Sequence, residues 1–165
     1  LTMKSKLIEI KWAIIFTVIA LLWMMFEKSM GWHDALIAKH ALYTNWFALI
    51  AILVFVVALL DKRKNSYNGK MRWMDGFKSG VLISIFVAVL SPLSQYITHE
   101  IISPNYFENI RNFSIESGEM TKEQAEDYFS FNSYVFQAAI GALVMGVVTS
   151  AVVAFFVKSK KTKGE

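Results

Sequence analysis

All three histidines of the chain lie close to carboxylates, near the ends of hydrophobic segments. His33 and His40 follow Glu27, and His99 directly precedes Glu100. Imidazole nitrogens together with a carboxylate oxygen form a donor set that binds zinc in proteins. His33 and His40 lack the HxxxH or HxH spacing that places two ligands on one face of an element. We therefore expect histidines that are hydrogen-bonded at a membrane interface, with no metal and no cofactor; the alternative is a metal-dependent enzyme at the outer face.

A second polar group surrounds the only proline that lies within a hydrophobic segment. Proline removes a backbone hydrogen bond and kinks a helix, so nearby polar side chains can face a pocket. The residues of this candidate ligand pocket are Ser91, Pro92, Ser94, Gln95 and, from the last hydrophobic segment, Gln137. Such a pocket would bind a small molecule or begin an ion path. The alternative is a kink whose freed carbonyl and side-chain amides satisfy one another.

Catalytic patterns are missing from the sequence. The chain has no cysteine, which excludes disulfides, thiolate metal sites and cysteine nucleophiles. The motifs GxSxG, HExxH and the phosphate loop do not occur. Residues 12–26, 42–60, 79–98 and 133–157 contain no Asp, Glu, Lys or Arg, whereas ion-coupled carriers usually depend on intramembrane carboxylates. We expect a protein that is not an enzyme.

Small residues recur at every fourth position in two of the hydrophobic segments. They are Gly76, Gly80, Ser84 and Ala88 in one segment, and Ala138, Ala142, Gly146, Ser150 and Ala154 in the other. Small residues one turn apart allow two helix backbones to approach closely within a membrane. The pattern predicts helix packing between these two segments, with a homodimer seam as the alternative.

Four hydrophobic segments are long enough to cross a membrane. Of the 165 residues, 55% are hydrophobic and 18% are charged. A bilayer core of about 30 Å needs about 20 apolar residues in helical form. The predicted spans are residues 12–30, 42–60, 77–98 and 133–157. Between the second and third spans, Asn68-Gly69 predicts a turn, because both residues tolerate positive φ. The predicted fold is an all-α, four-helix transmembrane bundle, with residues 1–165 forming a single domain.

Lysine and arginine are distributed unequally between the two sides of such a bundle. Most of the basic residues lie on the side that holds both termini and the connection between the second and third spans: Lys4, Lys6, Lys11, Lys62, Arg63, Lys64, Lys70, Arg72, Lys78, Lys158, Lys160, Lys161 and Lys163. The opposite side has only Lys28, Lys39, Arg111 and Lys122. Basic residues are enriched in cytoplasmic segments. The pattern predicts that both termini and the second connection are cytoplasmic. Because the basic residues flank apolar segments, we expect membrane lipids as partners, and no nucleic acid.

The segment 99–132, between the last two spans, should form an external helical hairpin. Ser103-Pro104 resembles a helix cap followed by proline at the first helical position. Thr121 and Gln124 match a capping box that opens a second short helix. This acidic hairpin would either dock a partner or cover the outer mouth of the bundle.

Several stretches of the chain together resemble one family of bacterial membrane proteins. They include YNGKMRWMDGFKSG, LSPLSQYITHEIISPNYF, MTKEQAEDYF and IGALVMGVVTSAVVAFFVK. The sequence is similar to the domain of unknown function 4199 family over nearly its whole length. The resemblance implies a small four-span protein of the bacterial inner membrane, and it carries no activity, cofactor or catalytic residue.

Good packing surfaces without catalytic motifs favour a non-enzymatic role. The first hypothesis is an accessory or structural subunit of a larger envelope complex, associating with other membrane subunits or with itself. The alternative is a small-molecule or ion permeation or binding protein that uses the pocket at the kink of the third span.

Overall fold

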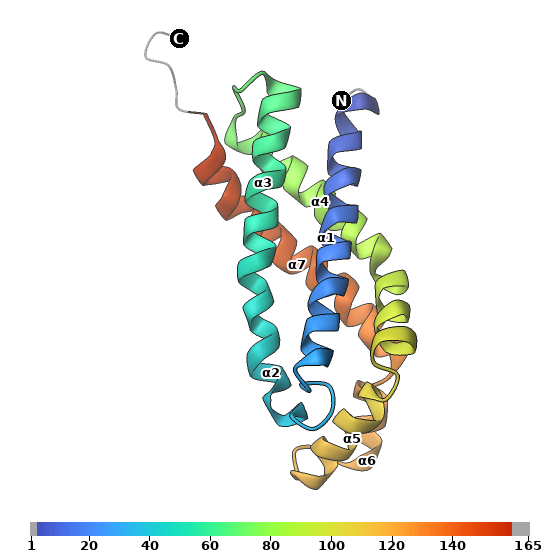
Figure 1. The fold of residues 1–165 in the computed structure, drawn as a ribbon. Helices are drawn as coiled ribbons and strands as arrows, with labels where there is room; N and C mark the ends of the chain where they lie inside the picture. Colours follow the sequence, from blue (N-terminus) through green and yellow to red (C-terminus); the bar gives the residue numbers. More distant parts are fainter. Residues whose placement is uncertain (1–2, 160–165) are drawn as a thin grey trace. The chain divides into compact units, whose positions relative to one another are not determined.

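The computed structural model describes residues 3–159, and most of them lie in helices. In chain order the elements are α1 (Met3–Ser29), η1 (Ile37–Lys39), α2 (His40–Tyr43), η2 (Thr44–Trp46), α3 (Phe47–Tyr67), α4 (Trp73–Tyr96), the π-helical segment η3 (Ile97–Ile102), α5 (Tyr106–Glu116), α6 (Lys122–Tyr128) and α7 (Phe131–Val157) (Figure 1). Within these residues there is no β-strand. The all-α prediction is confirmed.

Four helical segments are long and apolar enough to cross a membrane, as predicted. They cover Leu7–Ser29, Ile37–Tyr67, Trp73–Ile102 and Phe131–Val157. Large apolar side chains point outward along them, for example Phe156 with 78% of its surface exposed. The helices extend beyond the predicted spans because backbone hydrogen bonding continues through polar residues such as His99, which the sequence prediction had placed in the outer loop.

The chain forms two compact units, each of which takes segments from the same four long helices. Among the described residues, unit 1 comprises 3–16, 49–88 and 141–159, and unit 2 comprises 17–48 and 89–140. The histidines and the two short helices α5 and α6 belong to unit 2.

In unit 1, the small residues of α4 face those of α7. A Cβ atom built at Gly76 would lie 3.1 Å from Cβ of Ala154, and one built at Gly80 would lie 2.6 Å from Cβ of Ser150. A Cβ at Gly146 would overlap the side chain of Ser84. The hydroxyls of Ser84 and Ser150 donate to carbonyl oxygens of their own helices, four residues earlier. Each glycine therefore accommodates a small side chain of the other helix.

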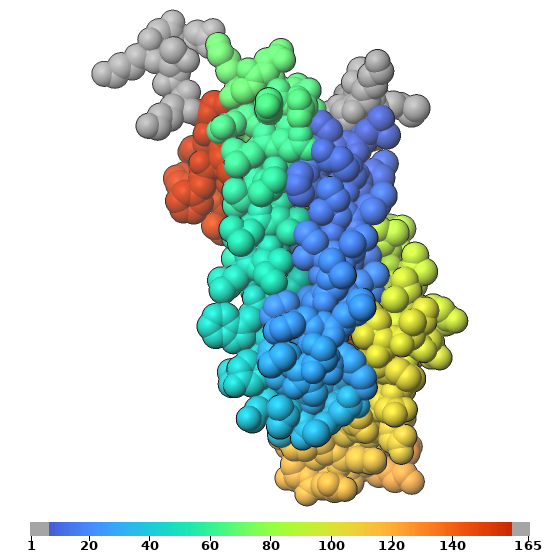
Figure 2. Space-filling view, in the orientation of Figure 1, coloured from blue at the N-terminus to red at the C-terminus, as the bar shows by residue number. Residues whose placement is uncertain are grey.

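Charged side chains join α1 to α3 in unit 1. Lys62 Nζ lies 2.7 Å from Glu9 Oε1, and both side chains are at most 2% exposed. Ser79 of α4 donates a hydrogen bond of 2.8 Å to the same Glu9 oxygen. Lys11 pairs with Asp61 nearby. On the face drawn in Figure 2, side chains of α1 (blue) adjoin those of α3 (green) along this unit.

The connection between α3 and α4 and the end of α7 lie at one end of unit 1. The predicted turn is confirmed, since Asn68 has φ 49° and Gly69 has φ 82°. Ser159, just beyond α7, donates its hydroxyl to the Gly69 carbonyl and accepts from the Met71 amide at 2.9 Å. The α3–α4 connection therefore contacts the chain just beyond α7, whereas Lys160, Lys161 and Lys163 of the basic tail lie outside the described residues.

In unit 2, α5 and α6 pack as a helical hairpin around Tyr106, Ile110, Ala125 and Phe129. The predicted capping box at the start of α6 is confirmed. The start of α5 differs from the prediction, which took Ser103 as the cap: the residue that precedes the helix is Asn105.

Candidate functional site

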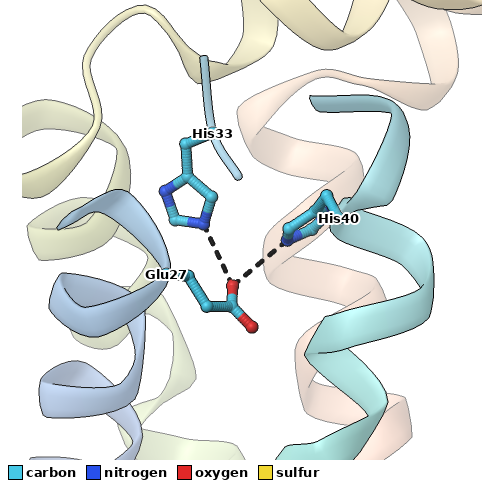
Figure 3. Close-up of side chains that lie close together, drawn as sticks. All are labelled: Glu27, His33 and His40. Atoms are coloured by element: carbon cyan, nitrogen blue, oxygen red, sulfur yellow. Dashed lines mark hydrogen bonds and ion pairs between the residues drawn. The ribbon is translucent and has the colours of Figure 1, made fainter. Parts of the chain in front are cut away.

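One carboxylate and two imidazoles meet in the interior of unit 2. Glu27 lies near the end of α1, His33 in the connection that follows, and His40 at the start of α2 (Figure 3). Glu27 Oε2 is 3.0 Å from His33 Nε2 and 3.2 Å from His40 Nε2. Glu27 is fully buried and His33 is 1% exposed. These three side chains, hereafter the Glu-His-His cluster, offer ligand atoms that all lie within 4.8 Å of one another.

Each member of the cluster is held by a further contact. The Trp23 indole donates to the other Glu27 oxygen. Ser103 Oγ lies 2.6 Å from His33 Nδ1, and the Tyr106 hydroxyl lies 3.4 Å from His40 Nδ1. Because a carboxylate oxygen only accepts, each histidine donates from Nε2, and a neutral ring then accepts at Nδ1. Ser103 is thus a buried partner of a histidine and does not cap α5.

Tyr106 stands between the Glu-His-His cluster and the third histidine. Its ring centroid lies 5.2 Å from that of His33 and 5.3 Å from those of His40 and His99. Its hydroxyl is 3.1 Å from the hydroxyl of Tyr134. Burial, followed by the neighbouring Tyr134, raises the pKa of the Tyr106 phenol well above its usual range. The phenol therefore remains neutral and keeps its proton for hydrogen bonding.

A cavity of about 230 Å³ adjoins the cluster within unit 2, and we call it the histidine cavity. Its lining residues are Ala20, Met24, His33, His40, Thr44, Phe47, Ser94, Gln95, Thr98, His99, Tyr106 and Tyr134. The cavity is therefore a polar and aromatic space that contains no lysine, arginine or carboxylate in its lining.

The residues of the predicted pocket take different places in unit 2. Ser94 and Gln95 line the histidine cavity. Pro92 lies inside α4 and is exposed, and Ser91 is buried in the same helix. Gln137 instead donates its amide to Ser133 Oγ at 2.9 Å on its own helix.

The spacing of the cluster suits a tetrahedral metal ion. Zinc binds imidazole nitrogen and carboxylate oxygen at about 2.0–2.2 Å, so neighbouring ligand atoms of a tetrahedral site lie roughly 3.3–3.6 Å apart. The distances of 3.0 Å and 3.2 Å between the two Nε2 atoms and Glu27 Oε2 are slightly shorter, so these side chains would move apart by a few tenths of an ångström around an ion. The partners of His33 and His40 at Nδ1 would orient the rings, as in many metal sites.

The sequence indicated the three histidines but not their convergence. His33 and His40 are seven positions apart, a helical repeat, but the segment between them is not a continuous helix, and the connection after α1 folds back to bring His33 toward Glu27. Tyr106 and Ser103 gave no functional signal, since a tyrosine and a serine near a predicted helix start are common. The closeness of Glu27 and two histidines within fourteen residues is the signal that was present.

Four apolar helical segments of membrane-spanning length define this chain as an all-helical, multi-pass membrane protein. Residues 11–159 match the model of the family described as "Protein of unknown function (DUF4199)". The chain belongs to this family, as its resemblance in sequence implied. No curated protein and no solved structure matches the chain.

Proposed function

We propose that this membrane protein binds a divalent transition-metal ion, with Zn²⁺ as the reference ion, at the Glu-His-His cluster. The proposal differs from the expectation for the sequence, which assigned no metal to these histidines and placed the ion-binding alternative at the kink of the third span. Its main support is the convergence of three ligand atoms within 4.8 Å in a buried position. The function is that of a binding protein, and no catalytic step is assigned to it.

The donor set of the cluster suits a transition-metal ion. A fully buried carboxylate is destabilising unless a cation or hydrogen-bond donors compensate it. Glu27 has two imidazole donors and one indole donor, which satisfy it without a metal. A divalent ion placed among the same three side chains would replace two of these hydrogen bonds by coordination bonds. Imidazole nitrogen suits Zn²⁺, Cu²⁺ and Ni²⁺ better than Mg²⁺ or Ca²⁺.

Metal binding can be measured on the chain purified in detergent through an affinity tag that contains no histidine. After treatment with a chelator, the protein is equilibrated with Zn²⁺, and the bound metal is counted by elemental analysis. We expect about one ion per chain and a higher thermal unfolding temperature, because a ligand that binds only the folded state stabilises it.

Two variants separate this site from adventitious binding. His33→Phe keeps a ring of similar size in contact with its neighbours but removes a ligand, so it should lose the ion. Asp34→Asn changes a carboxylate in the same connection, one that pairs with Lys28 and lies outside the cluster, and it should retain the ion. Zinc content that is equal in wild type and His33→Phe would refute the proposal.

For the membrane topology, we propose that both termini and the connection between α3 and α4 are in the cytoplasm of a bacterium, at the inner membrane. The unequal distribution of lysine and arginine supports this orientation. The meeting of the α3–α4 connection with the end of α7 is consistent with it.

An accessory role in an envelope complex is a second proposal, supported by the surface of α5 and α6. The exposed acidic residues there are Glu108, Glu116, Glu119, Glu123, Glu126 and Asp127. A basic partner surface would complement them. The small residues Gly80 and Gly146 contact the chain's own helices in unit 1, so the acidic surface is the better docking candidate. Extraction with a mild detergent followed by native electrophoresis should show a complex, and a strictly monomeric particle would refute this role.

A further inference from the structure

Two hydroxyl groups near the start of α5 contact the two histidines of the Glu-His-His cluster. Ser103 Oγ lies 2.6 Å from His33 Nδ1, and the Tyr106 hydroxyl lies 3.4 Å from His40 Nδ1. Tyr106 is the first residue of α5, and its backbone amide donates to the Ser103 carbonyl at 3.0 Å. Ser103 is 1% exposed and Tyr106 is 4% exposed. A segment of four residues therefore supplies one buried partner to each ring.

The Glu27 carboxylate sets the direction of these hydrogen bonds when no metal is bound. It accepts from both Nε2 atoms, so each neutral ring carries its proton on Nε2 and accepts at Nδ1. The hydroxyls of Ser103 and Tyr106 are then the donors. The oxygen of Tyr106 can at the same time accept from the Tyr134 hydroxyl, which lies 3.1 Å away.

A metal ion at Nε2 requires the opposite direction. The metal takes the lone pair of Nε2, so a neutral ring must carry its proton on Nδ1. Each ring loses one proton at Nε2 and gains one at Nδ1, and its charge does not change. Nδ1 is then a donor, so the oxygens of Ser103 and Tyr106 must accept. The proton of the Tyr106 hydroxyl can turn to the oxygen of Tyr134.

We infer that Ser103, Tyr106 and Tyr134 form a hydroxyl relay whose hydrogen bonds reverse direction when a metal ion binds, and that these residues position the two imidazole ligands. The inference rests on the metal site proposed above and names the residues that set its affinity. A metal-bound imidazole is a stronger N–H donor than a free one, because the dication withdraws electron density from the ring. The reversed hydrogen bonds are therefore the stronger ones, and the relay favours the metal-bound state.

The reversal can be observed by nuclear magnetic resonance on the detergent-purified chain labelled with ¹⁵N-histidine. Long-range ¹H–¹⁵N correlation spectra show which ring nitrogen carries the proton. His33 and His40 should carry it on Nε2 without metal and on Nδ1 with Zn²⁺. His99 provides an internal reference, since its Nε2 is 3.0 Å from Gln95 Oε1 and should keep its proton in both states. The signal of His99 is identified by its loss in His99→Phe.

Zinc affinity, measured by competition with a chromophoric chelator, tests the contribution of each hydroxyl. Ser103→Ala and Tyr106→Phe each remove the acceptor that contacts a ligand and should lower the affinity about ten- to a hundredfold. Tyr134→Phe removes only the acceptor for Tyr106 and should lower it about three- to tenfold. Tyr96→Phe removes the hydroxyl of an exposed tyrosine of α4 and should bind as the wild type does. If Tyr106→Phe does not fold, Ser103→Ala and Tyr134→Phe still test the relay.

The outcomes separate this inference from the proposed function. If the wild type binds no Zn²⁺, the metal site is refuted and the relay with it. If Zn²⁺ binds but both rings keep their proton on Nε2, the reversal is refuted while a metal site stands. If the rings reverse but the relay variants bind Zn²⁺ as tightly as Tyr96→Phe does, the positioning role of the three hydroxyls is refuted.

Discussion

The close packing of α4 against α7 can be tested with two alanine substitutions in the same helix. Gly146 and Gly141 are both in α7, but their surroundings differ. A Cβ atom at Gly146 would lie 2.5 Å from Cβ of Ser84, whereas a Cβ at Gly141 would meet no atom within 4 Å. Carbon atoms in normal contact are about 3.5–4.0 Å apart. Gly146→Ala therefore requires a local displacement of about 1 Å, and Gly141→Ala requires none.

The difference in free energy of unfolding between the two variants can be estimated from the effects that they do and do not share. Both replace a helical glycine by alanine, so both gain the same intrinsic helix preference of up to about 1 kcal/mol. Overpacking of a close contact costs about 1–3 kcal/mol. The free energy of unfolding should therefore be about 1–3 kcal/mol lower for Gly146→Ala than for Gly141→Ala. Combining Gly146→Ala with Ser84→Gly removes the overlapping Cβ and Oγ atoms and should restore most of the difference.

The assay is reversible unfolding in mixed micelles with increasing sodium dodecyl sulfate, followed by far-ultraviolet circular dichroism. The three variants and the wild type are compared under the same conditions. Equal free energies of unfolding for Gly146→Ala and Gly141→Ala would show that α4 and α7 do not meet at this position. A failure of Ser84→Gly to restore stability would show that another contact is responsible for the loss.

Three further predictions concern the buried ion pair, the capping box and the topology. Lys62→Met leaves the buried carboxylate of Glu9 without its cation and should lower the free energy of unfolding by about 3–5 kcal/mol in the same assay. Adding Glu9→Gln should recover most of this loss. A Lys62→Met variant as stable as the wild type would contradict the prediction. Thr121→Ala removes the cap of α6 and should lower the stability of this helix by about 1 kcal/mol, which would appear as faster amide hydrogen exchange confined to α6. Unchanged exchange in α6 would count against the cap. Because the chain has no cysteine, Lys70→Cys and Glu119→Cys each introduce a single labelling site. A membrane-impermeant maleimide applied to intact spheroplasts should label Glu119→Cys and not Lys70→Cys. The reverse pattern would overturn the proposed orientation.

Features that depend on local sequence were predictable. The number of long helices followed from the length of the uncharged segments, since a membrane offers the peptide backbone no hydrogen-bond partner. The turn at Asn68-Gly69 and the capping box at Thr121 were predictable because their hydrogen bonds and φ angles involve residues at most a few positions apart. Ser103 was misread as a cap because its actual partner, His33, lies 70 residues away.

The burial of charged residues was less predictable. Glu9, Lys62 and Glu27 lie toward the ends of the apolar segments, where the sequence alone indicates exposure at the membrane surface. Contacts from other helices and connections enclose them, so that each is at most 2% exposed. Glu9 and Lys62 come from helices that are distant in the chain. His33 and His40 are close to Glu27 in the sequence, but the connection after α1 must fold back to bring them to its carboxylate.

By itself, the sequence determined that this chain is a four-span helical membrane protein, because apolar length and local hydrogen bonding are properties of single segments. Only the tertiary structure decided that Glu27, His33 and His40 meet, and that His99 reaches the same cavity. The physical reason is that a metal-ligand set depends on the distances between side chains. Those distances are set by the course of the connection after α1 and by the packing of Tyr106 among the three imidazoles.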